Sequence, residues 1–350
     1  MVSLKHWFVS VSLAVAIASP VHAQEATDTV APEAATPQLQ AADGRRPVRA
    51  KNWMVAAANP LAVVAGAQIL QRGGSAADAA VAVQLVLGLV EPQSSGLGGG
   101  AFALYWDAAA GKLMTYDGRE TAPRAATPRL FQDEKGEPLK FFDAVIGGRS
   151  VGVPGTPMLL AELHEDAGRL AWEELFDAAI RLAENGFPVS PRLAGSAAAA
   201  ADSLARFDAT RRYFITELSQ ALATGEPLKN PDYAAALRAL RDGGVDAFYA
   251  GPIAADIVAT VRNAPGNPGA LTLDDLAAYR VKIRPPVCIV YRRHDVCGMG
   301  PPSSGGLTVG QILGMLAPFD MTAHSPDDPQ TWRLIGDAAR LGFADRGRYM

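Results

Sequence analysis

The sequence predicts a layered α/β or α+β fold. Three features carry this prediction: an early pair of apolar helical patterns, a β-hairpin pattern that follows them, and a second β-hairpin pattern after several helical segments. Of the 350 residues, 49% are hydrophobic and 19% are charged, so the chain is able to bury a substantial core. The length corresponds to one large domain or two smaller ones.

The first 23 residues have the pattern of a secretory signal peptide. Lys5 supplies a positive charge, residues 7–18 are apolar, and Val21-His22-Ala23 offers small residues for cleavage. Twelve apolar residues are too few to cross a bilayer core of about 30 Å as a helix, so no stable membrane anchor is expected. We predict an exported protein, periplasmic or secreted. Residues 24–50, rich in Ala, Pro, Thr and Gln, are predicted to form a disordered spacer before a folded region over 51–350.

The folded region opens with two predicted helices. Asn59-Pro60 is a typical helix start, and the pattern continues over residues 61–71 to a glycine pair. Ser75 and Asp78 then have capping-box spacing ahead of an apolar helix over 76–89, which Glu91-Pro92 ends. A helix that is apolar on nearly all faces belongs inside a layered fold.

The remaining elements follow the same rules of periodicity and turn chemistry. Strands are predicted over 101–106 and 113–116, joined by a turn at Ala110-Gly111, and residues 121–150 read as irregular. Further predicted helices cover 158–167, 172–185, 233–241 and 254–262, with strands over 287–291 and 295–299. The last segment, 332–350, has helical periodicity up to the chain end, and we expect the chain to be truncated there.

The chain has two cysteines, and both lie in the second predicted hairpin. If Arg292-Arg293 form a two-residue turn, Cys288 falls opposite Cys297, where a disulfide is possible. Two buried free thiols are the alternative, which the sequence leaves open. The pair supplies too few ligands for a metal site.

Several other chemistries are disfavoured. A net charge of −4 argues against nucleic-acid binding. Ser150 lies in a G-x-S-x-G pattern, but the Gly/Pro-rich residues after it do not start a helix, as a nucleophile elbow requires. The glycines at 98–100 precede a strand and lack the lysine of a phosphate loop, so we expect them to allow close backbone packing. The hydroxyls at 303–304 are expected to cap the next helix, and His164-Glu165-Asp166 to form a charged surface turn.

Arg119 is the strongest candidate for a ligand contact. It follows the predicted strand over 113–116 and lies close in sequence to the glycine turn. A guanidinium is suited to bind a carboxylate through two parallel hydrogen bonds. On spacing alone, a surface ion pair with Glu120 is the favoured alternative.

Taken together, these segments resemble the γ-glutamyltranspeptidase (glutathione hydrolase) family of N-terminal-nucleophile (Ntn) hydrolases. The resemblance runs from about Met54 to Tyr349, with the matching motifs in the family's order. The segments that carry it are residues 73–80 (GGSAADAA), 92–102, 116–123 (YDGRETAP), 153–156 (VPGT), 182–187, 274–279 (DDLAAY) and 301–306 (PPSSGG).

The resemblance implies an incomplete αββα sandwich of the Ntn-hydrolase type, of which this chain is the large-subunit half. It also implies a precursor that cuts itself before a threonine, whose freed amine serves as general base while the hydroxyl attacks the γ-glutamyl amide of glutathione. Arg119 matches the arginine that binds the donor's α-carboxylate, which replaces the surface-pair interpretation. The catalytic threonine is expected beyond Met350, so the 350 residues alone are expected to be inactive.

The expected partners are glutathione or another γ-glutamyl donor and the small-subunit segment of the same precursor, with no metal and no organic cofactor. Two alternatives remain. A related Ntn acylase, similar to the cephalosporin acylases, shares the scaffold, and a non-enzymatic exported binding protein would use the glycine loops to hold a small ligand.

Overall fold

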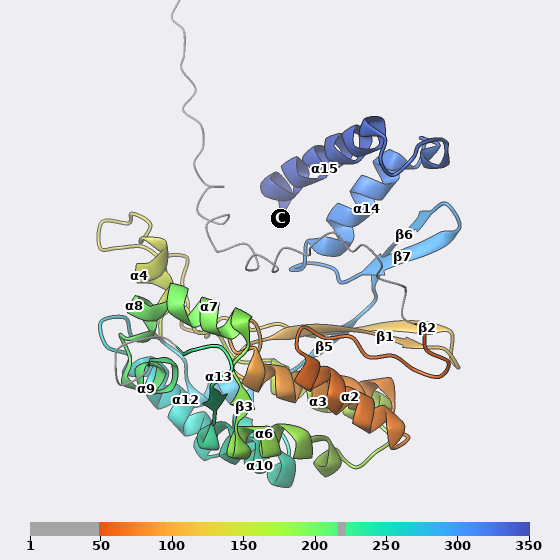
Figure 1. Cartoon of the computed structure of the whole chain (residues 1–350). Helices are drawn as coiled ribbons and strands as arrows, with labels where there is room; N and C mark the ends of the chain where they lie inside the picture. The colour runs from red at the N-terminus through yellow and green to blue at the C-terminus, as the bar shows by residue number, and fades with distance from the viewer. Residues whose placement is uncertain (1–48, 216–221) are drawn as a thin grey trace, which may run out of the picture. The chain divides into compact units, whose positions relative to one another are not determined.

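The computed structural model describes residues 49–215 and 222–350 (Figure 1). The predicted signal sequence over 1–23 and nearly all of the predicted 24–50 spacer lie outside the described residues. Within the described part of the chain, no helix is both long enough and apolar enough to span a bilayer.

The first two helices form as predicted and pack against each other. In α2 (Pro60–Gln71), the Asn59 side chain accepts a hydrogen bond from the Leu61 amide at 3.0 Å. At the start of α3 (Ala76–Val90), Ser75 and Asp78 form the predicted capping box. Ser75 Oγ accepts from the Asp78 amide at 3.1 Å, and Asp78 Oδ2 accepts from the Ser75 amide at 2.8 Å. Helix α3 is buried on most of its faces and contributes much of the core.

A three-stranded antiparallel sheet follows, in the order β1-β2-β5. Strands β1 (Ala101–Asp107) and β2 (Lys112–Gly118) form the predicted hairpin, and β5 (Lys282–Arg284) pairs with β2 from a distant part of the chain. Helix α5 (Thr156–Ala167) packs against β1 and β2, and α3 packs against α5. One face of the sheet is therefore covered by helices, which confirms the predicted layered α/β class.

The other helices complete the layer around α3. The predicted helix over 172–185 is divided into a short 3₁₀ helix η1 (Trp172–Leu175) and α6 (Asp177–Asn185). The chain turns at the fully buried Phe176, whose ring contacts that of Trp172 edge-on with centroids 4.9 Å apart. Periodicity alone did not reveal this break. The remaining elements of this part are α4 (Phe141–Val145), β3 (Phe187–Pro188), α7 (Pro191–Ala199), α8 (Ala201–Leu204), α9 (Asp208–Phe214), β4 (Pro227–Leu228), α10 (Pro231–Gly243), α11 (Asp246–Tyr249), α12 (Pro252–Arg262) and α13 (Leu273–Ala277).

The C-terminal elements contact one another. Strands β6 (Val287–Tyr291) and β7 (His294–Gly298) pair in the predicted register, with Tyr291 opposite His294, and Arg292 in the turn has a φ of 60°. Helix α14 (Gly305–Leu316) packs on both strands. After the 3₁₀ helix η2 (Met321–Ala323), α15 (Pro329–Tyr349) packs along α14 and confirms the helical pattern of the last segment.

Candidate functional site

Arg119 directly follows β2, and both of its backbone polar groups are bound. Its amide donates to Asp117 Oδ1 at 3.1 Å, and its carbonyl accepts from the hydroxyl of Tyr279 at 2.8 Å. The side chain is 57% exposed, with Nε 3.1 Å from Glu120 Oε2. The structure thus contains the Arg119–Glu120 ion pair that the sequence offered as the alternative, on a fixed backbone and with the guanidinium still accessible to solvent.

Two neighbouring segments pack against the Arg119 segment at distances that require glycine. A Cβ added at Gly155 would overlap the carbonyl oxygen of Gly118, and one added at Gly100 would lie 2.7 Å from both that oxygen and Glu120 Oε2. The carbonyl of Gly99 accepts from the amides of Gly155 and Thr156 at 2.8 and 3.1 Å, which joins the glycine turn to the start of α5. Close backbone packing therefore explains Gly100, whereas an added Cβ at Gly98 would meet nothing within 4 Å.

Tyr279, the last residue of the DDLAAY motif over 274–279, is a further residue of this region that the sequence does not predict as a site residue. Its ring is buried, and its hydroxyl donates to the Arg119 carbonyl. Burial, followed by the charges of Asp117 and Glu120, raises the pKa of Tyr279 to about 12. The hydroxyl consequently stays protonated and able to donate at neutral pH.

The hydroxyls of Ser150 in the G-x-S-x-G pattern and of Ser304 in the loop over residues 301–306 each form a hydrogen bond with another part of the chain. Ser150 Oγ donates to the carbonyl of Val145 at 2.6 Å, in a turn that no helix follows directly. Ser304 does not cap α14 through its side chain, contrary to prediction. Instead its hydroxyl accepts from Arg346 Nε at 2.9 Å, because α15 packs along α14 and brings that guanidinium within reach.

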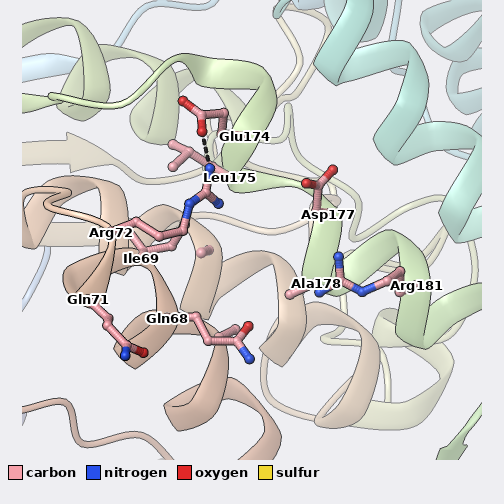
Figure 2. Close-up of a pocket in the computed structure, with 11 residues that line it drawn as sticks. Gln68, Ile69, Gln71, Arg72, Glu174, Leu175, Asp177, Ala178 and Arg181 are labelled. Atoms are coloured by element: carbon pink, nitrogen blue, oxygen red, sulfur yellow. Dashed lines mark hydrogen bonds and ion pairs between the residues drawn. The ribbon is translucent and has the colours of Figure 1, made fainter.

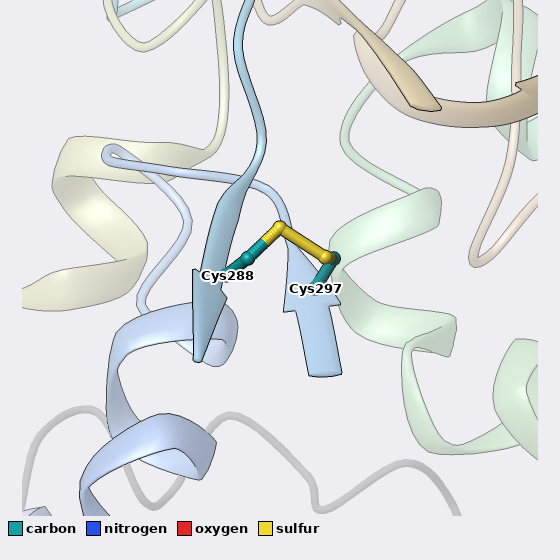
Figure 3. Close-up of a disulfide and its surroundings, with 2 residues drawn as sticks. All are labelled: Cys288 and Cys297. Carbon is teal, nitrogen blue, oxygen red and sulfur yellow. A yellow bond between two sulfur atoms is a disulfide. The ribbon is translucent and has the colours of Figure 1, made fainter. Parts of the chain in front are cut away.

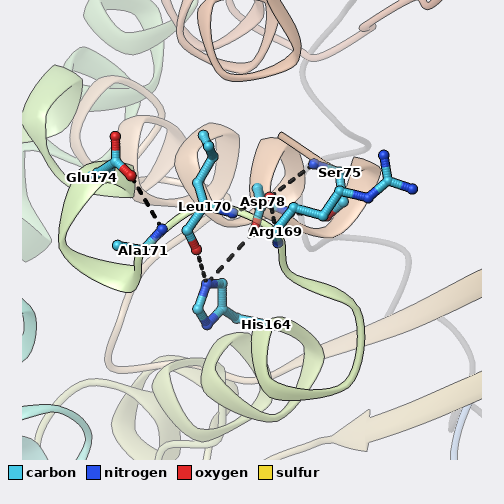
Figure 4. Close-up of polar contacts among 7 residues, drawn as sticks. All are labelled: Ser75, Asp78, His164, Arg169, Leu170, Ala171 and Glu174. Atoms are coloured by element: carbon cyan, nitrogen blue, oxygen red, sulfur yellow. Dashed lines mark hydrogen bonds and ion pairs between the residues drawn. The ribbon is translucent and has the colours of Figure 1, made fainter. Parts of the chain in front are cut away.

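His164 is not in a charged surface turn, and that prediction is wrong. It lies within α5 with a side chain 18% exposed, and its Nε2 is 2.9 Å from the Leu170 carbonyl and 3.6 Å from Oδ1 of the fully buried Asp78 (Figure 4). Asp78 Oδ2 also accepts from the amides of Arg169 and Leu170 at 2.9 and 3.2 Å. The cluster ties the start of α3 to the chain after α5, so we assign it a structural role.

A pocket of about 220 Å³ lies between α2 and the η1–α6 segment (Figure 2). Gln68 of α2 and Arg72, the residue that directly follows α2, line one side of the pocket. Glu174, Asp177 and Arg181 line the other side. The ion pair of Arg72 with Glu174 is 44% and 40% exposed, so both charges remain solvated. Arg119 does not line this pocket. Because the charged side chains of the Arg72–Glu174 pair remain exposed to solvent, the pocket is not a strong candidate for a binding site.

The two cysteines lie opposite each other in the β6–β7 hairpin, and the structure joins them by a disulfide (Figure 3). Their Cα atoms are 4.1 Å apart. Over residues 49–215 and 222–350, no three His, Cys, Asp or Glu side chains gather in a way that would hold a metal ion.

The sequence of this chain is similar to that of known proteins. The family profile described as gamma-glutamyltranspeptidase matches residues 62–350. The glutathione hydrolase proenzyme of Bacillus subtilis (strain 168) is 36% identical over 299 residues, which cover 85% of this chain and 50% of that relative. The chain thus spans about half the length of the curated relatives it matches.

Solved structures share the fold. A γ-glutamyltranspeptidase from Helicobacter pylori superposes with a TM-score of 0.82 at 32% identity, over 87% of this chain and 86% of that one. A cephalosporin acylase from Bacillus halodurans superposes with a TM-score of 0.72, also at 32% identity, over 86% of this chain and 56% of that one.

Proposed function

The chain belongs to the gamma-glutamyltranspeptidase family, and from this premise we propose that it is the large-subunit part of a glutathione hydrolase precursor. The complete protein would cleave the γ-glutamyl amide of glutathione and transfer the glutamyl group to water or to an amino acid. The catalytic threonine would come from the C-terminal part of the precursor, outside this chain.

The geometry around Arg119 is the observation that carries this proposal. Its backbone is bound on both sides, while its guanidinium is 57% exposed and accessible to a ligand. A guanidinium forms two parallel, charge-assisted hydrogen bonds to a carboxylate, which fixes the orientation as well as the affinity of a donor. We assign Arg119 the α-carboxylate of the γ-glutamyl donor.

The proposed reaction needs no oxidant or reductant. The threonine hydroxyl attacks the γ-carbonyl carbon, an ester bond forms, and the amide C–N bond breaks as cysteinylglycine leaves as an amine. The threonine's own α-amine accepts the hydroxyl proton and returns it to the leaving nitrogen. Water or an amino acid then attacks the ester, and free glutamate or a new γ-glutamyl amide is released.

The sheet supports the proposal of a small-subunit partner. Ala103 and Tyr105 of β1 pack against the core, whereas Leu104 and Trp106 on the opposite face are 44% and 59% exposed. Exposed apolar side chains side by side on a sheet face favour packing of a further layer. We propose that the small-subunit segment packs on this face and completes an αββα sandwich.

We also propose that the protein is exported. It is supported by the signal-like pattern over residues 1–23 and by the disulfide between Cys288 and Cys297, since disulfides persist in oxidising compartments. Mass measurement of the mature protein's N-terminus tests it, and a protein that still begins at Met1 would contradict it.

The test of the proposed function is an assay of the complete precursor with glutathione. We expect self-cleavage into two subunits and release of glutamate, faster when an amino acid is added as acceptor. A complete protein that cuts itself but leaves every γ-glutamyl amide intact would overturn the assignment.

Replacement of the proposed carboxylate-binding residue tests the role of Arg119. We expect Arg119→Ala to raise KM for glutathione by about 30-fold or more, because about 2 kcal/mol or more of charge-assisted binding is lost. Arg119→Lys should give an intermediate KM, since it keeps the charge but not the two-pronged geometry. Arg72→Ala, which removes an arginine of similar exposure from an ion pair elsewhere, is the matched control and should leave KM unchanged. Equal KM values for Arg119→Ala and wild type would refute this role.

A second candidate function follows from the cephalosporin acylase structure that shares the fold. A glutaryl amide has a terminal carboxylate that Arg119 can bind equally well, but it lacks the α-ammonium group of a glutamyl donor. The complete protein should therefore be compared with γ-glutamyl and glutaryl p-nitroanilide. A higher kcat/KM for the glutaryl compound would replace the glutathione assignment with that of an acylase.

A further inference from the structure

The DDLAAY motif over residues 274–279 is held firmly in the fold. Residues 274–279 cover helix α13 from its second residue onward, together with the tyrosine that follows the helix. The start of α13 is anchored by a capping box, in which Asp275 Oδ2 accepts from the amide and hydroxyl of Thr272 at 3.0 and 2.7 Å. Leu276 and Tyr279 are buried in the core. The motif is therefore a firmly held element.

Two hydrogen bonds connect this element to the chain around Arg119. The Tyr279 hydroxyl donates to the Arg119 carbonyl at 2.8 Å, and Asp275 Oδ1 accepts from the Arg124 amide at 3.1 Å. The bonds bracket residues 119–124, which run from the proposed carboxylate-binding residue into irregular chain. Because the partners are 160 and 151 residues apart in sequence, these bonds tie the segment to a distant part of the fold.

A second tyrosine holds the first in place. The rings of Tyr249 and Tyr279 are stacked with centroids 5.9 Å apart and planes 7° from parallel. The Tyr249 hydroxyl donates to the carbonyl of Pro154 at 2.8 Å, beside Gly155, which packs on Gly118. The stacked pair therefore binds both backbone segments that meet at the end of β2.

We propose that Tyr279 is a positioning residue for donor binding, which acts by holding the Arg119 backbone so that the guanidinium meets the donor's carboxylate. Asp275 has the same role at the other end of the segment. The inference rests on the proposed function of Arg119 and extends it to residues that touch no substrate. Ordering a flexible segment on binding costs free energy, so a backbone that is already fixed around Arg119 leaves more of the ion-pair energy for binding the donor.

The test uses the complete, self-cleaved protein and measures KM and kcat separately. Tyr279→Phe removes one hydroxyl and keeps the ring stack, so we expect KM for glutathione to rise about fivefold, the effect of one net hydrogen bond, with kcat within about twofold of wild type. Asp275→Asn should change KM in the same direction. Tyr233→Phe is the matched control, because that buried hydroxyl also donates to a backbone carbonyl, that of Leu85, at 2.9 Å.

A double mutant separates positioning from general destabilisation. In the Arg119→Ala background there is no guanidinium to position, so Tyr279→Phe should not raise KM further. If Tyr279→Phe raises KM as much in that background as in wild type, or no more than Tyr233→Phe does, the positioning role is overturned while the role of Arg119 stands. If Arg119→Ala itself leaves KM unchanged, the proposed function fails instead. Thermal melting of each variant establishes that it is folded at the assay temperature.

Discussion

At the scale of single residues, the region around Arg119 depends on groups without a side chain as much as on charged ones. Gly100, Gly118 and Gly155 lie on three segments that approach so closely that a Cβ atom at any of the three positions would collide with a neighbouring segment. That packing brings Tyr279 within hydrogen-bond distance of the Arg119 carbonyl. The proposed binding of a carboxylate by Arg119 thus depends on several residues that would not contact the substrate themselves.

Asp275 gives a pH-dependent prediction at this scale. Burial alone would raise its pKa, but hydrogen bonds from the Thr272 side chain and from the amides of Arg124 and Thr272 outweigh burial and lower it. A carboxyl whose pKa is lower in the folded state stabilises the fold above its unfolded pKa, about 3.9, and this contribution is lost as the pH falls through the folded value.

We therefore expect Asp275→Asn to lower the Tm at pH 7, with the difference from wild type shrinking as the pH is lowered below about 4. Thermal melts of the two proteins across this pH range measure the difference. Asp208→Asn is a control, since the pKa of this exposed carboxyl is lowered mainly by its hydrogen bond to Arg211 on the surface, where solvent screens the pair. A difference between wild type and Asp275→Asn that grows toward acid pH would contradict the sign of this linkage.

At the scale of elements, the β6–β7 hairpin shows how a short turn sets the positions of its strands. A two-residue turn at Arg292-Arg293, with Arg292 in the left-handed region, places Cys288 opposite Cys297. Side chains that face each other across an antiparallel pair are close enough for a disulfide. The bond closes a loop whose ends are nine residues apart, which stabilises the hairpin mainly by restricting the unfolded chain.

The disulfide can be tested by chemical labelling of the exported protein. We expect iodoacetamide to modify neither cysteine before reduction and both after reduction under denaturing conditions. Replacing both cysteines with serine should lower stability by roughly 2–3 kcal/mol on the loop-entropy estimate, measured by denaturant unfolding. Labelling of both thiols without a reductant would show instead that they are free.

At the scale of the whole molecule, the main sheet has helices on one face and exposed apolar side chains on the other. Strand β1 alternates between the two environments, because successive side chains of a strand point to opposite faces. Ala103 and Tyr105 enter the core, and Leu104 and Trp106 do not. A sheet with helices on one face is half of an αββα sandwich, which agrees with a chain that spans half the length of its relatives.

Placing a charge on the exposed sheet face tests its proposed partner. We expect Trp106→Glu to prevent the two subunits of the complete protein from assembling, because packing a further layer would bury an unpaired carboxylate. Phe142→Glu is the control, because Phe142 is an aromatic residue of similar exposure, 61%, on helix α4. The subunits of this variant should assemble normally. Size-exclusion chromatography after self-cleavage measures assembly, and a Trp106→Glu protein that elutes as an intact, active complex would refute the proposed interface.

Local patterns in the sequence were sufficient for the two early helices, both hairpins and most of the longer helices. They missed α4, which lies in the 121–150 segment predicted to be irregular, and the short elements β3, β4, β5, α7, α8, α9, α11 and α13. The capping box of Ser75 and Asp78, the hairpin turns and the helical periodicities all depend on residues within a few positions of each other, so they can be read along the chain. The division of the 172–185 helix at Phe176 was missed, since the burial of that ring depends on elements distant in sequence. His164 was misjudged for the same reason, because its partner Asp78 precedes it by 86 residues.

By itself, the sequence determined the α/β class, the two early helices, the two hairpins, the opposition of Cys288 and Cys297, and the family whose pattern gives Arg119 its candidate role. Only the tertiary structure decided which groups surround that arginine. Tyr279 and Asp275 lie more than 150 residues from the backbone they bind, and Gly155 packs on Gly118 from another segment. Contacts of this range follow from how whole layers pack, and no local pattern of residues encodes them.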